Sequence, residues 1–415
     1  MAAPSRICIV GLGYIGLPTA AALATRGLDV VGVDVVPGVV DAINRGEAPF
    51  SEPDLAVAVS GAVAMGRLRA TTAPEAADAF VIAVPTPIRE DQTADRSYIE
   101  AAAEAIAPVL RPGNLVVLES TSPPGTTLRL SRWLAERRPD LTFPHDHQDA
   151  ADVNVAHCPE RVLPGRIMIE IVMNDRVIGG VSPTCAERAR DLYAVVTQGR
   201  IHLTDATTAE MAKLSENAYR DVNIGYANEL SMICDHLGID VHEVIELANR
   251  HPRVNVLQPG PGVGGHCIAV DPWFIVEAAP EHARLIRTAR EVNESKPSYV
   301  VGEVVKSAQR YRDPVIACLG LTFKADVDDL RESPALRITT DLVRHGLGRV
   351  VVAEPHVDAL PADLAALGGV RLVDTAAAIE EADIVLLLVD HAEFRGVKRA
   401  ALRGKVVFDT RGVWR

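Results

Sequence analysis

The stretch RICIVGLGYIGLPTAAALATRGLDVVGVD, residues 6–34, decides the fold. It consists of an apolar strand, a turn with the pattern GxGxxG, an alanine-rich helix and a second apolar strand that ends in an acid. In such a βαβ unit the glycines let a pyrophosphate approach the backbone, and the helix N-terminus holds it electrostatically. The residues of this predicted dinucleotide site are Gly11, Gly13, Tyr14, Ile15, Gly16 and Asp34.

Asp34 bears on the choice of dinucleotide. An acid at the end of the second strand accepts hydrogen bonds from the hydroxyls of the adenosine ribose and repels a 2′-phosphate. The pattern therefore favours NAD over NADP. The alternative for this stretch is a glycine-rich turn that binds nothing.

The rest of the N-terminal half repeats the alternation of strands and helices. Strand-like apolar runs occupy 79–87, 114–125 and 175–180, and residues 97–109 show a helical pattern. Strands that alternate with helices predict a parallel, doubly wound sheet. We assign this first Rossmann-like domain to residues 1–203.

The pattern changes after residue 203. Helical periodicity without strand signals runs over 204–249, and alternation returns with strand-like runs at 349–355, 382–390 and 405–410. The sequence therefore predicts an α/β protein with two Rossmann-like doubly wound domains, the second at 310–415, joined by a central helical spacer at 204–309. A spacer of this length often makes a dimer interface, so we expect a homodimer through the central helix.

Composition excludes several classes of function. The formal net charge of the 415 residues is −13, whereas proteins that bind nucleic acid need a basic surface. No stretch reaches about 18 uncharged apolar residues, so we expect no membrane-spanning segment and no membrane partner. The six cysteines are scattered and form no CxxC pair, which suits a reducing cytoplasm and argues against a metal site.

A group of polar residues lies on the helical spacer. Lys213, Asn217 and Arg220 stand at i, i+4 and i+7, so their side chains share one face of a helix. A polar stripe is usually a solvated surface. If the stripe instead faces the cofactor, Lys213 and Asn217 can donate hydrogen bonds to an oxyanion.

The segment GPGVGGHCIAVDPWF, residues 260–274, contains the candidate nucleophile Cys267. A catalytic thiol needs nearby cations or aligned N–H donors, and the glycines, Gly264 among them, allow backbone and substrate to pack closely. His266 is a candidate base. From composition alone, Cys267 is better explained as a small buried hydrophobe, which is the usual role of an unpaired cysteine.

Two loops are candidates for substrate contacts. HCPERVLPGR, residues 157–166, presents Glu160 and Arg161 after a strand-like run, and FKADVDDLRESPA, residues 323–335, presents Lys324 and Arg331. Ligands of open α/β sheets bind at loops that follow strand ends. The alternative is that both are solvated loops.

Taken together, these motifs resemble the UDP-glucose/GDP-mannose dehydrogenase family over essentially the whole chain. The resemblance rests on GLGYIG, ESTSPPGTT (119–127), CPERVLPG, KLSENAYRDVNIGYANELS, GPGVGGHCIAVDPWF, LIRTAREVNESKP, DDLRESPA and the terminal GVWR. Two positions depart from the wider family, which commonly has proline where this chain has Ala269. UDP-glucose dehydrogenases commonly have a second glutamate where it has Pro164.

The resemblance implies a four-electron oxidation of C6 of a UDP-sugar to a carboxylate, with two NAD reduced in sequence. Water near Thr121 and Asp271 helps remove the hydroxyl proton, and Cys267 captures the aldehyde as a thiohemiacetal, which a second hydride loss converts to a thioester. Lys213 and Asn217 stabilise the oxyanion, and Asp271 with Glu160 activates the hydrolytic water.

The resemblance also implies binding roles. Cofactor contacts are expected from Thr86, Thr121 and Arg331, and substrate contacts from Glu160, Arg161, Lys213, Asn217, Arg220, Arg253, Gly264, Lys324 and Arg411. Among these, Arg253 is expected to reach the substrate across the dimer and Arg411 to lie near the uridine.

Several alternatives stay open. The motifs VDPWF and RDVNIGYANE favour the branch that acts on UDP-N-acetyl-D-mannosamine, but UDP-N-acetylglucosamine, UDP-N-acetylgalactosamine and UDP-glucose remain alternative substrates. A two-electron hydroxyacid dehydrogenase shares the glycine turn and the lysine–asparagine pair, but it needs neither Cys267 nor a second nucleotide domain. A nucleotide sensor without catalysis is the non-enzyme alternative.

Overall fold

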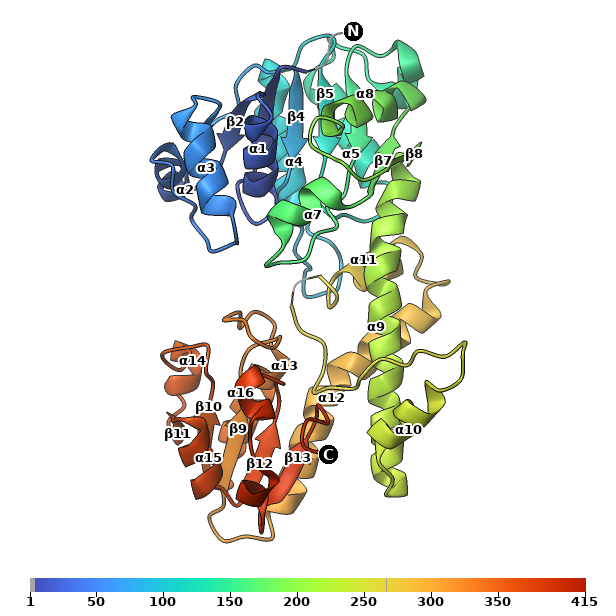
Figure 1. The fold of residues 1–415 in the computed structure, drawn as a ribbon. Coiled ribbons are helices and arrows are strands. Elements are labelled where there is room, and N and C mark those ends of the chain that lie inside the picture. Colours follow the sequence, from blue (N-terminus) through green and yellow to red (C-terminus); the bar gives the residue numbers. More distant parts are fainter. Residues whose placement is uncertain (1–3, 266) are drawn as a thin grey trace. The chain divides into compact units, whose positions relative to one another are not determined.

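The computed structural model describes residues 4–265 and 267–415. The chain divides into two compact units. Unit 1 comprises Met1–Glu216 and Trp273–Pro280, and unit 2 comprises Asn217–Pro272 and Glu281–Arg415 (Figure 1). The division into three domains at residues 203 and 309 stays a prediction.

Unit 1 is built on an eight-stranded sheet with the order β3-β2-β1-β4-β5-β6-β7-β8. The strands are β1 (Arg6–Val10), β2 (Asp29–Val33), β3 (Leu68–Thr71), β4 (Ala79–Ile82), β5 (Leu115–Leu118), β6 (Asn154–His157), β7 (Arg176–Gly180) and β8 (Ile201–Asp205). Neighbouring strands are parallel except β6 and β7, which pair antiparallel. The order reverses at β1 and β4, which is where doubly wound sheets bind ligands.

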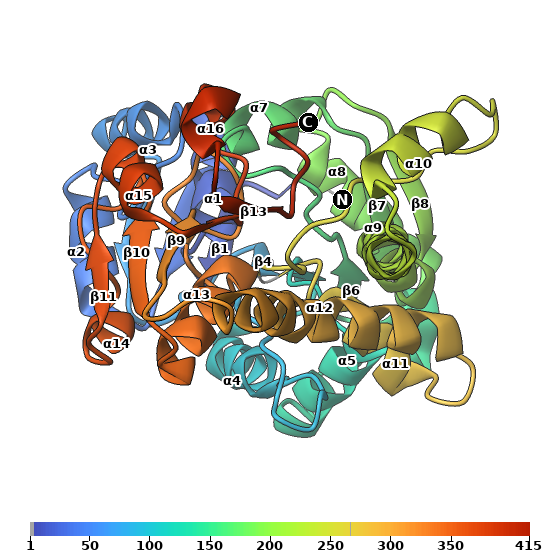
Figure 2. The same ribbon diagram turned by 90° about the horizontal axis from the view of Figure 1, so that it is seen from below.

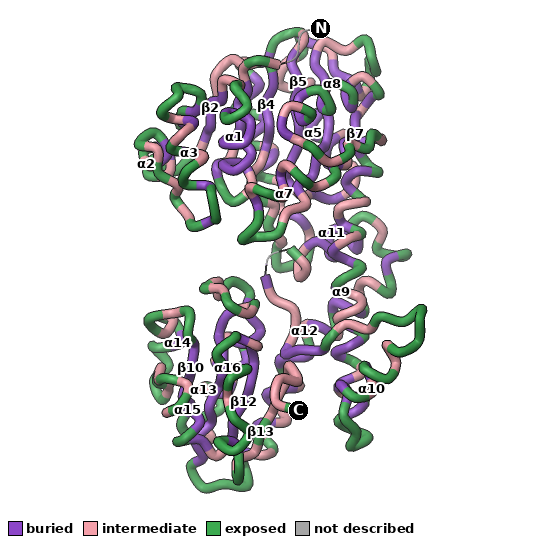
Figure 3. Tube along the Cα trace, viewed as in Figure 1, coloured by how far each residue is buried: buried purple, intermediate pink, exposed green. Residues whose placement is uncertain are grey.

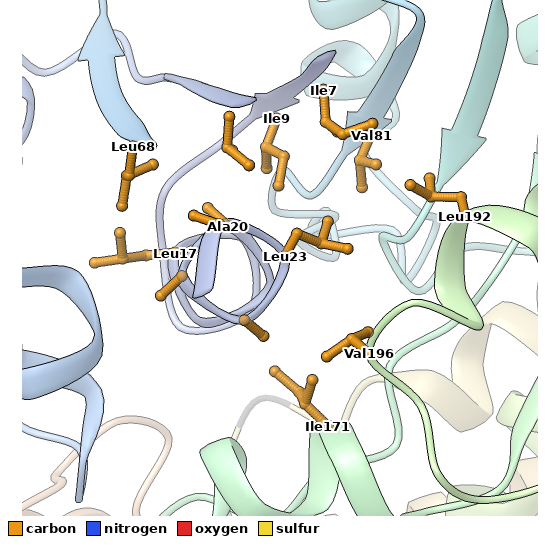
Figure 4. Close-up of a cluster of buried hydrophobic side chains, with 14 of the residues drawn as sticks. Ile7, Ile9, Leu17, Ala20, Leu23, Leu68, Val81, Ile171, Leu192 and Val196 are labelled. Carbon is orange, nitrogen blue, oxygen red and sulfur yellow. The ribbon is translucent and has the colours of Figure 1, made fainter. Parts of the chain in front are cut away.

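Helices cover both faces of this sheet, so its central strands are buried on both sides. The helices are α1 (Gly16–Thr25), α2 (Pro37–Asn44), α3 (Leu55–Ala64), α4 (Ser97–Ile106), α5 (Thr126–Arg137), α6 (Pro144–His147), α7 (Ile167–Met173) and α8 (Pro183–Tyr193). On one face, Ile7, Ile9 and Val81 belong to the same core as Leu17 and Leu23 of α1 (Figure 4). The opposite core combines residues of the same strands with α4 and α5.

Unit 2 contains a five-stranded, fully parallel sheet with the order β11-β10-β9-β12-β13. Its strands are β9 (Val315–Leu319), β10 (Arg349–Ala353), β11 (Val370–Leu372), β12 (Ile384–Leu387) and β13 (Val406–Asp409). The helices around it are α12 (Arg284–Ala308), α13 (Pro334–His345), α14 (Ala362–Ala365), α15 (Thr375–Glu381) and α16 (Ala392–Arg395). α12 packs along α13 (Figure 2), and the central strands are buried (Figure 3). The prediction of two doubly wound α/β sheets is confirmed.

The predicted helical spacer consists chiefly of one long helix. α9 (Ala206–Leu237) is followed by α10 (Val241–Ala248), and the break between them falls at Gly238, which has a φ of 70°. Asp240 then caps α10 by accepting the N–H of His242 at 2.8 Å. After the glycine-rich segment, α11 (Asp271–Ala278) begins. No helix among the described residues is long and apolar enough to cross a membrane.

Candidate functional site

The glycine turn between β1 and α1 leaves space at one position and none at the other two. Gly11 has a φ of 94° and donates its N–H to the carbonyl of Val33 at 2.8 Å. A Cβ on Gly16 would lie 1.8 Å from the carbonyl oxygen of Gly11, whereas a Cβ on Gly13 would meet no heavy atom within 4 Å. Gly13 is exposed at the turn, so a ligand can approach the backbone there.

Asp34, which follows β2, connects to this turn through hydrogen bonds of its carboxylate. Its Oδ2 accepts the N–H of Leu12 at 3.1 Å, and its Oδ1 accepts the N–H of Val36 at 2.9 Å. The neighbouring Tyr14 is exposed, and its ring stacks on Phe50 with centroids 4.3 Å apart. Ile15 is the N-cap residue of α1. The predicted cofactor residues of the glycine turn and Asp34 therefore lie together at one edge of unit 1, whereas Arg331, which is also predicted to contact the cofactor, belongs to unit 2.

Thr86 and Thr121 follow β4 and β5, whose carboxyl ends lie at the same edge as the glycine turn. Ser120 connects the two loops because its hydroxyl donates to the carbonyl of Val84 at 2.7 Å. The hydroxyl of Thr86 is buried without a hydrogen-bond partner among the described residues. An unpartnered buried hydroxyl is costly, so a bound molecule that supplies a partner is favoured here.

Glu160 follows β6 and is buried. Its Oε2 lies 3.1 Å from Nη2 of Arg176, and its Oε1 accepts the N–H of Arg161 at 2.7 Å. Arg161 itself pairs with Glu216 at 2.6 Å. Glu160 is thus held within the core of unit 1, which excludes the alternative of a solvated loop for this residue.

The polar stripe on α9 is not uniformly solvated. Lys213 is half-buried, Asn217 is buried and Arg220 is exposed. Nδ2 of Asn217 donates to Oδ2 of Asp271 at 2.6 Å, and Asp271 is itself buried at the start of α11. This contact brings together two of the residues predicted to be catalytic.

Cys267 is exposed, whereas the other five cysteines are buried. Its carbonyl oxygen accepts the N–H groups of Val270 and Asp271, at 3.2 and 2.9 Å, in the turn that leads into α11. An exposed thiol does not fill a core, so the explanation of Cys267 as a buried hydrophobe fails. His266 lies outside the described residues.

The first glycines of the same segment are fixed within unit 2. Gly260 donates its N–H to Oδ1 of Asn228 at 2.9 Å, and a Cβ on Gly260 would lie 2.5 Å from Nη1 of Arg411. A Cβ on Gly264 would lie 2.7 Å from the carbonyl of Glu332. The segment therefore packs against the loop 323–335 and against the predicted uridine contact.

The predicted cations of unit 2 differ in their surroundings. Arg411 donates to Oδ1 of Asp390 at 2.8 Å, and Arg331 pairs with Asp329 at 2.6 Å. Lys324 and Arg253 are exposed. The predicted catalytic residues are divided between the units, with Thr121, Glu160 and Lys213 in unit 1 and Asn217, Cys267 and Asp271 in unit 2.

Sequence reasoning missed the partners of these residues. Arg176 and Asp390 occupy strand-like runs, and Asn228 lies within the segment KLSENAYRDVNIGYANELS. Nothing in these local patterns indicates that they contact Glu160, Arg411 and Gly260. A further group, Asp326 with His356 and His391, has the composition of a metal site. However, Nδ1 of His391 accepts the N–H of Asp326 at 2.9 Å, and Asp326 accepts the N–H of Ala392 at 2.9 Å. These bonds anchor the start of α16, and a cation would have to displace the first of them.

Known proteins are similar to this chain over nearly its whole length. Three models of the UDP-glucose/GDP-mannose dehydrogenase family match the chain: the NAD binding domain at residues 5–197, the central domain at 207–295 and the UDP binding domain at 317–415. The chain is 61% identical over 408 residues to an NDP-N-acetyl-D-galactosaminuronic acid dehydrogenase of Ralstonia nicotianae, covering 98% of this chain and 96% of the relative. It is 54% identical over 417 residues to the UDP-N-acetyl-D-mannosamine dehydrogenase of Escherichia coli, covering 99% of both.

Solved structures give the same relationship. The UDP-N-acetyl-mannosamine dehydrogenase of Staphylococcus aureus aligns with a TM-score of 0.87 at 43% identity, covering 99% of this chain and 96% of that one. The UDP-D-ManNAc dehydrogenase of Pyrococcus horikoshii aligns with the same TM-score at 39% identity and the same coverage.

Proposed function

The chain belongs to the UDP-glucose/GDP-mannose dehydrogenase family, and from this premise we propose that it oxidises C6 of a UDP-N-acetylhexosamine to a carboxylate through covalent intermediates on Cys267. It is an oxidoreductase that uses NAD and acts on a UDP-sugar. The single observation that carries the covalent mechanism is the exposed Cys267 in the turn before Asp271, whose carboxylate is bonded to Asn217.

The glycine turn of unit 1 fits the cofactor. Gly13 leaves the backbone open to a pyrophosphate, and the carboxylate of Asp34 stands at the end of β2, where ribose hydroxyls are bound in such folds. We assign further contacts to Tyr14, Ile15 and Thr86. When bound, NAD supplies the acceptor for hydride.

Cys267 makes the second oxidation possible. Its sulfur adds to the aldehyde carbon, and the carbonyl oxygen takes up a proton, which gives a thiohemiacetal that still carries a C–H bond. Loss of that hydrogen as hydride, together with the hydroxyl proton, leaves a thioester. Water then attacks the thioester carbon and releases the acid and the thiol of Cys267.

The surrounding residues stabilise charge and handle water. Asn217 donates one amide hydrogen to Asp271 and retains a second for the oxyanion, alongside the ammonium of Lys213. Asp271 and Thr121 hold the water that helps remove the proton of the C6 hydroxyl, and Asp271 with Glu160 activates the hydrolytic water.

Contacts to the UDP-sugar are proposed for cations on both units. They are Arg161, Arg220, Lys324, Arg253 across the dimer and Arg411 at the uridine. Arg331, on the same loop as Lys324, is proposed to contact the cofactor instead. The packing of Gly260 and Gly264 against Arg411 and the loop 323–335 supports this placement, because it joins the thiol-bearing segment to these residues within unit 2.

Two sugars are favoured by specific observations. The motifs VDPWF and RDVNIGYANE match the branch that acts on UDP-N-acetyl-D-mannosamine, which we propose as the substrate. The 61% identity to a relative named for N-acetyl-D-galactosaminuronic acid favours UDP-N-acetyl-D-galactosamine as the second candidate. The two sugars differ at C2 and C4, away from the reacting C6.

A homodimer through α9 is also proposed. Tyr219, Tyr226 and Ile233 stand seven residues apart on this helix and are 66%, 55% and 48% exposed, and Leu237 extends the stripe at 62%. Large apolar side chains in a row on one helix are typical of a helix–helix interface. A single species of 44.4 kDa in analytical ultracentrifugation would contradict the dimer.

The test is an anaerobic assay of the purified protein with NAD and a panel of UDP-sugars, in which NADH per sugar and product mass are recorded. We expect two NADH and a uronic acid, with UDP-N-acetyl-D-mannosamine oxidised fastest. A faster reaction with UDP-N-acetyl-D-galactosamine replaces the substrate but keeps the mechanism. One NADH or none would overturn the role of Cys267, and Cys267→Ser is expected to stop the acid from forming efficiently.

A further inference from the structure

Arg176, the first residue of β7, has a guanidinium that is fixed by its neighbours. Its side chain is only 4% exposed. Nε donates to Oγ1 of Thr197 at 2.9 Å, and Nη2 donates to the carbonyl oxygen of Ile171 at 3.3 Å. The ring of Tyr193 lies under the guanidinium, with its centroid 4.7 Å from Cζ. The charge of Arg176 is therefore held in one position.

Glu160 lies directly against this charge. Its Oε2 is 3.1 Å from Nη2 of Arg176, and its Oε1 accepts the backbone N–H of Arg161 at 2.7 Å. Oε1 thus has a hydrogen-bond donor, whereas Oε2 lies beside the charge of Arg176 without a hydrogen bond among the described residues. An unpaired buried carboxylate would be expensive, so the arginine makes this location possible for Glu160.

A second buried carboxyl group, Glu119, lies in the same cluster. Its Oε1 accepts the hydroxyl of Tyr193 at 3.2 Å and that of Thr19 at 3.4 Å, and its Oε2 has no hydrogen-bond partner among the described residues. Burial and the charge of Glu160 raise the pKa of Glu119 to about 8, against the opposing effect of Arg176. At neutral pH Glu119 therefore keeps its proton and leaves the arginine to pair with Glu160.

We propose that Arg176 is a positioning residue, whose buried guanidinium holds the Glu160 carboxylate in the orientation needed for hydrolysis of the thioester. The inference rests on the proposed function, in which Glu160 acts on the hydrolytic water. Arg176 acts through Glu160 alone, so the two hydride transfers do not depend on it. The hydrogen bonds to Thr197 and Ile171 fix the planar guanidinium beside Glu160, so lysine keeps the charge but loses these contacts and the geometry.

The test is Arg176→Lys, studied by rapid quench with the sugar that wild type oxidises fastest. We expect both NADH equivalents to form in the first turnover and the steady-state kcat to fall about 10- to 100-fold, as misplacement of a catalytic group does. Intact-protein mass should then show the acyl group of the UDP-sugar on Cys267. KM should fall in proportion to kcat, because kcat/KM reports the unaffected steps that precede the thioester. Arg138→Lys is the matched control in unit 1, because Arg138 binds the carbonyls of Ala107 and Leu110 and should give no adduct.

Two results would overturn the proposal. One is a wild-type kcat in Arg176→Lys, and the other is a loss of the first hydride transfer together with the adduct. Glu160→Gln distinguishes a failure of the positioning role of Arg176 from a failure of the hydrolytic role of Glu160. If it accumulates the adduct and Arg176→Lys does not, the positioning role alone fails. If Glu160→Gln accumulates no adduct, Glu160 has no role in hydrolysis, and the positioning role of Arg176 is then also wrong.

A milder variant covers the case in which Arg176→Lys does not fold. Thr197→Val keeps both charges of the Arg176–Glu160 pair but removes the acceptor of Nε, so the guanidinium is held less firmly in place. We expect the same adduct at a lower level. A folded Thr197→Val protein without any adduct would then overturn the proposal.

Discussion

The side-chain amide of Asn217 donates to a carboxylate oxygen of Asp271 at 2.6 Å, and both residues are buried. The two therefore act as a unit, and changes at one position alter the other. Asn217→Asp would place two carboxylates in contact, which is unfavourable in a buried site. It also removes a donor for the oxyanion, a change that costs about 100- to 1,000-fold in kcat in comparable sites.

Exchanging the two side chains distinguishes the loss of stability caused by charge repulsion from the loss of catalytic activity. In the double variant Asn217→Asp with Asp271→Asn, one amide again faces one carboxylate. We expect its melting temperature to recover most of the loss seen in Asn217→Asp, whereas kcat/KM stays low because donor and acceptor have exchanged places. Recovery of both quantities would show that neither residue has a specific catalytic role.

Asn228 connects the glycine-rich segment to the helices of unit 2. Its Oδ1 accepts the N–H of Gly260 at 2.9 Å, and its Nδ2 donates to Oδ1 of Asn293 at 2.9 Å. Asn228→Ala leaves both partners unsatisfied in a buried position, so we expect the free energy of unfolding to fall by about 1–3 kcal/mol per lost partner. Equilibrium unfolding in urea measures this change in the free energy of unfolding. Asn223→Ala is the control on the same helix, because among the described residues its amide donates to the carbonyl of Tyr219 alone, in an exposed hydrogen bond. A loss of similar size there would refute the specific role of Asn228.

Glu119 makes the stability of the protein depend on pH. Its folded-state pKa is raised to about 8, above the ordinary value of 4.5, so between these values the folded state binds more protons than the unfolded state. Stability therefore falls as pH rises from about 5 to 8, by up to about 1.4 kcal/mol for each pH unit. Glu119→Gln retains a neutral group next to Arg176 and Tyr193 and lacks this titration.

The measurement is the melting temperature of both proteins from pH 5 to pH 8. We expect the difference between Glu119→Gln and wild type to grow in favour of the variant as pH rises. Glu136→Gln, at an exposed position of α5, should show no such trend. A difference that does not change with pH would mean that Glu119 is ionised throughout.

Most of the fold follows from the sequence because apolar runs and glycine turns determine it locally. The runs at 79–87 and 114–125 predicted strands that are too long, since β4 ends at Ile82 and β5 at Leu118. Their tails, AVPTP and ESTSPPG, each contain two prolines, which cannot donate to a neighbouring strand. The short β11 was missed because a three-residue strand at the sheet edge, with its middle residue exposed and the other two half-buried, produces little pattern.

The site was predictable only where its residues are neighbours in sequence. The shared face of Lys213 and Asn217 follows from helical spacing, but the bond from Asn217 to Asp271 joins positions 54 residues apart. The contact of Arg176 with Glu160 depends on the antiparallel pairing of β6 and β7, which a pattern of alternating strands and helices does not reveal. Long-range pairing therefore sets the electrostatics that local spacing leaves open.

Substitutions at Gly13 and Gly16 distinguish an effect on NAD binding from an effect on stability. A Cβ on Gly16 would lie 1.8 Å from the carbonyl oxygen of Gly11, so Gly16→Ala has to displace the start of α1 and should lower both stability and NAD affinity. A Cβ on Gly13 meets no heavy atom within 4 Å. Gly13→Ala should therefore keep the wild-type melting temperature but lower the affinity for NAD, because the new methyl group occupies the space that a pyrophosphate needs. Calorimetric titration with NAD and thermal unfolding measure the two effects. Unchanged NAD affinity in a folded Gly13→Ala protein would mean that the pyrophosphate binds elsewhere on unit 1.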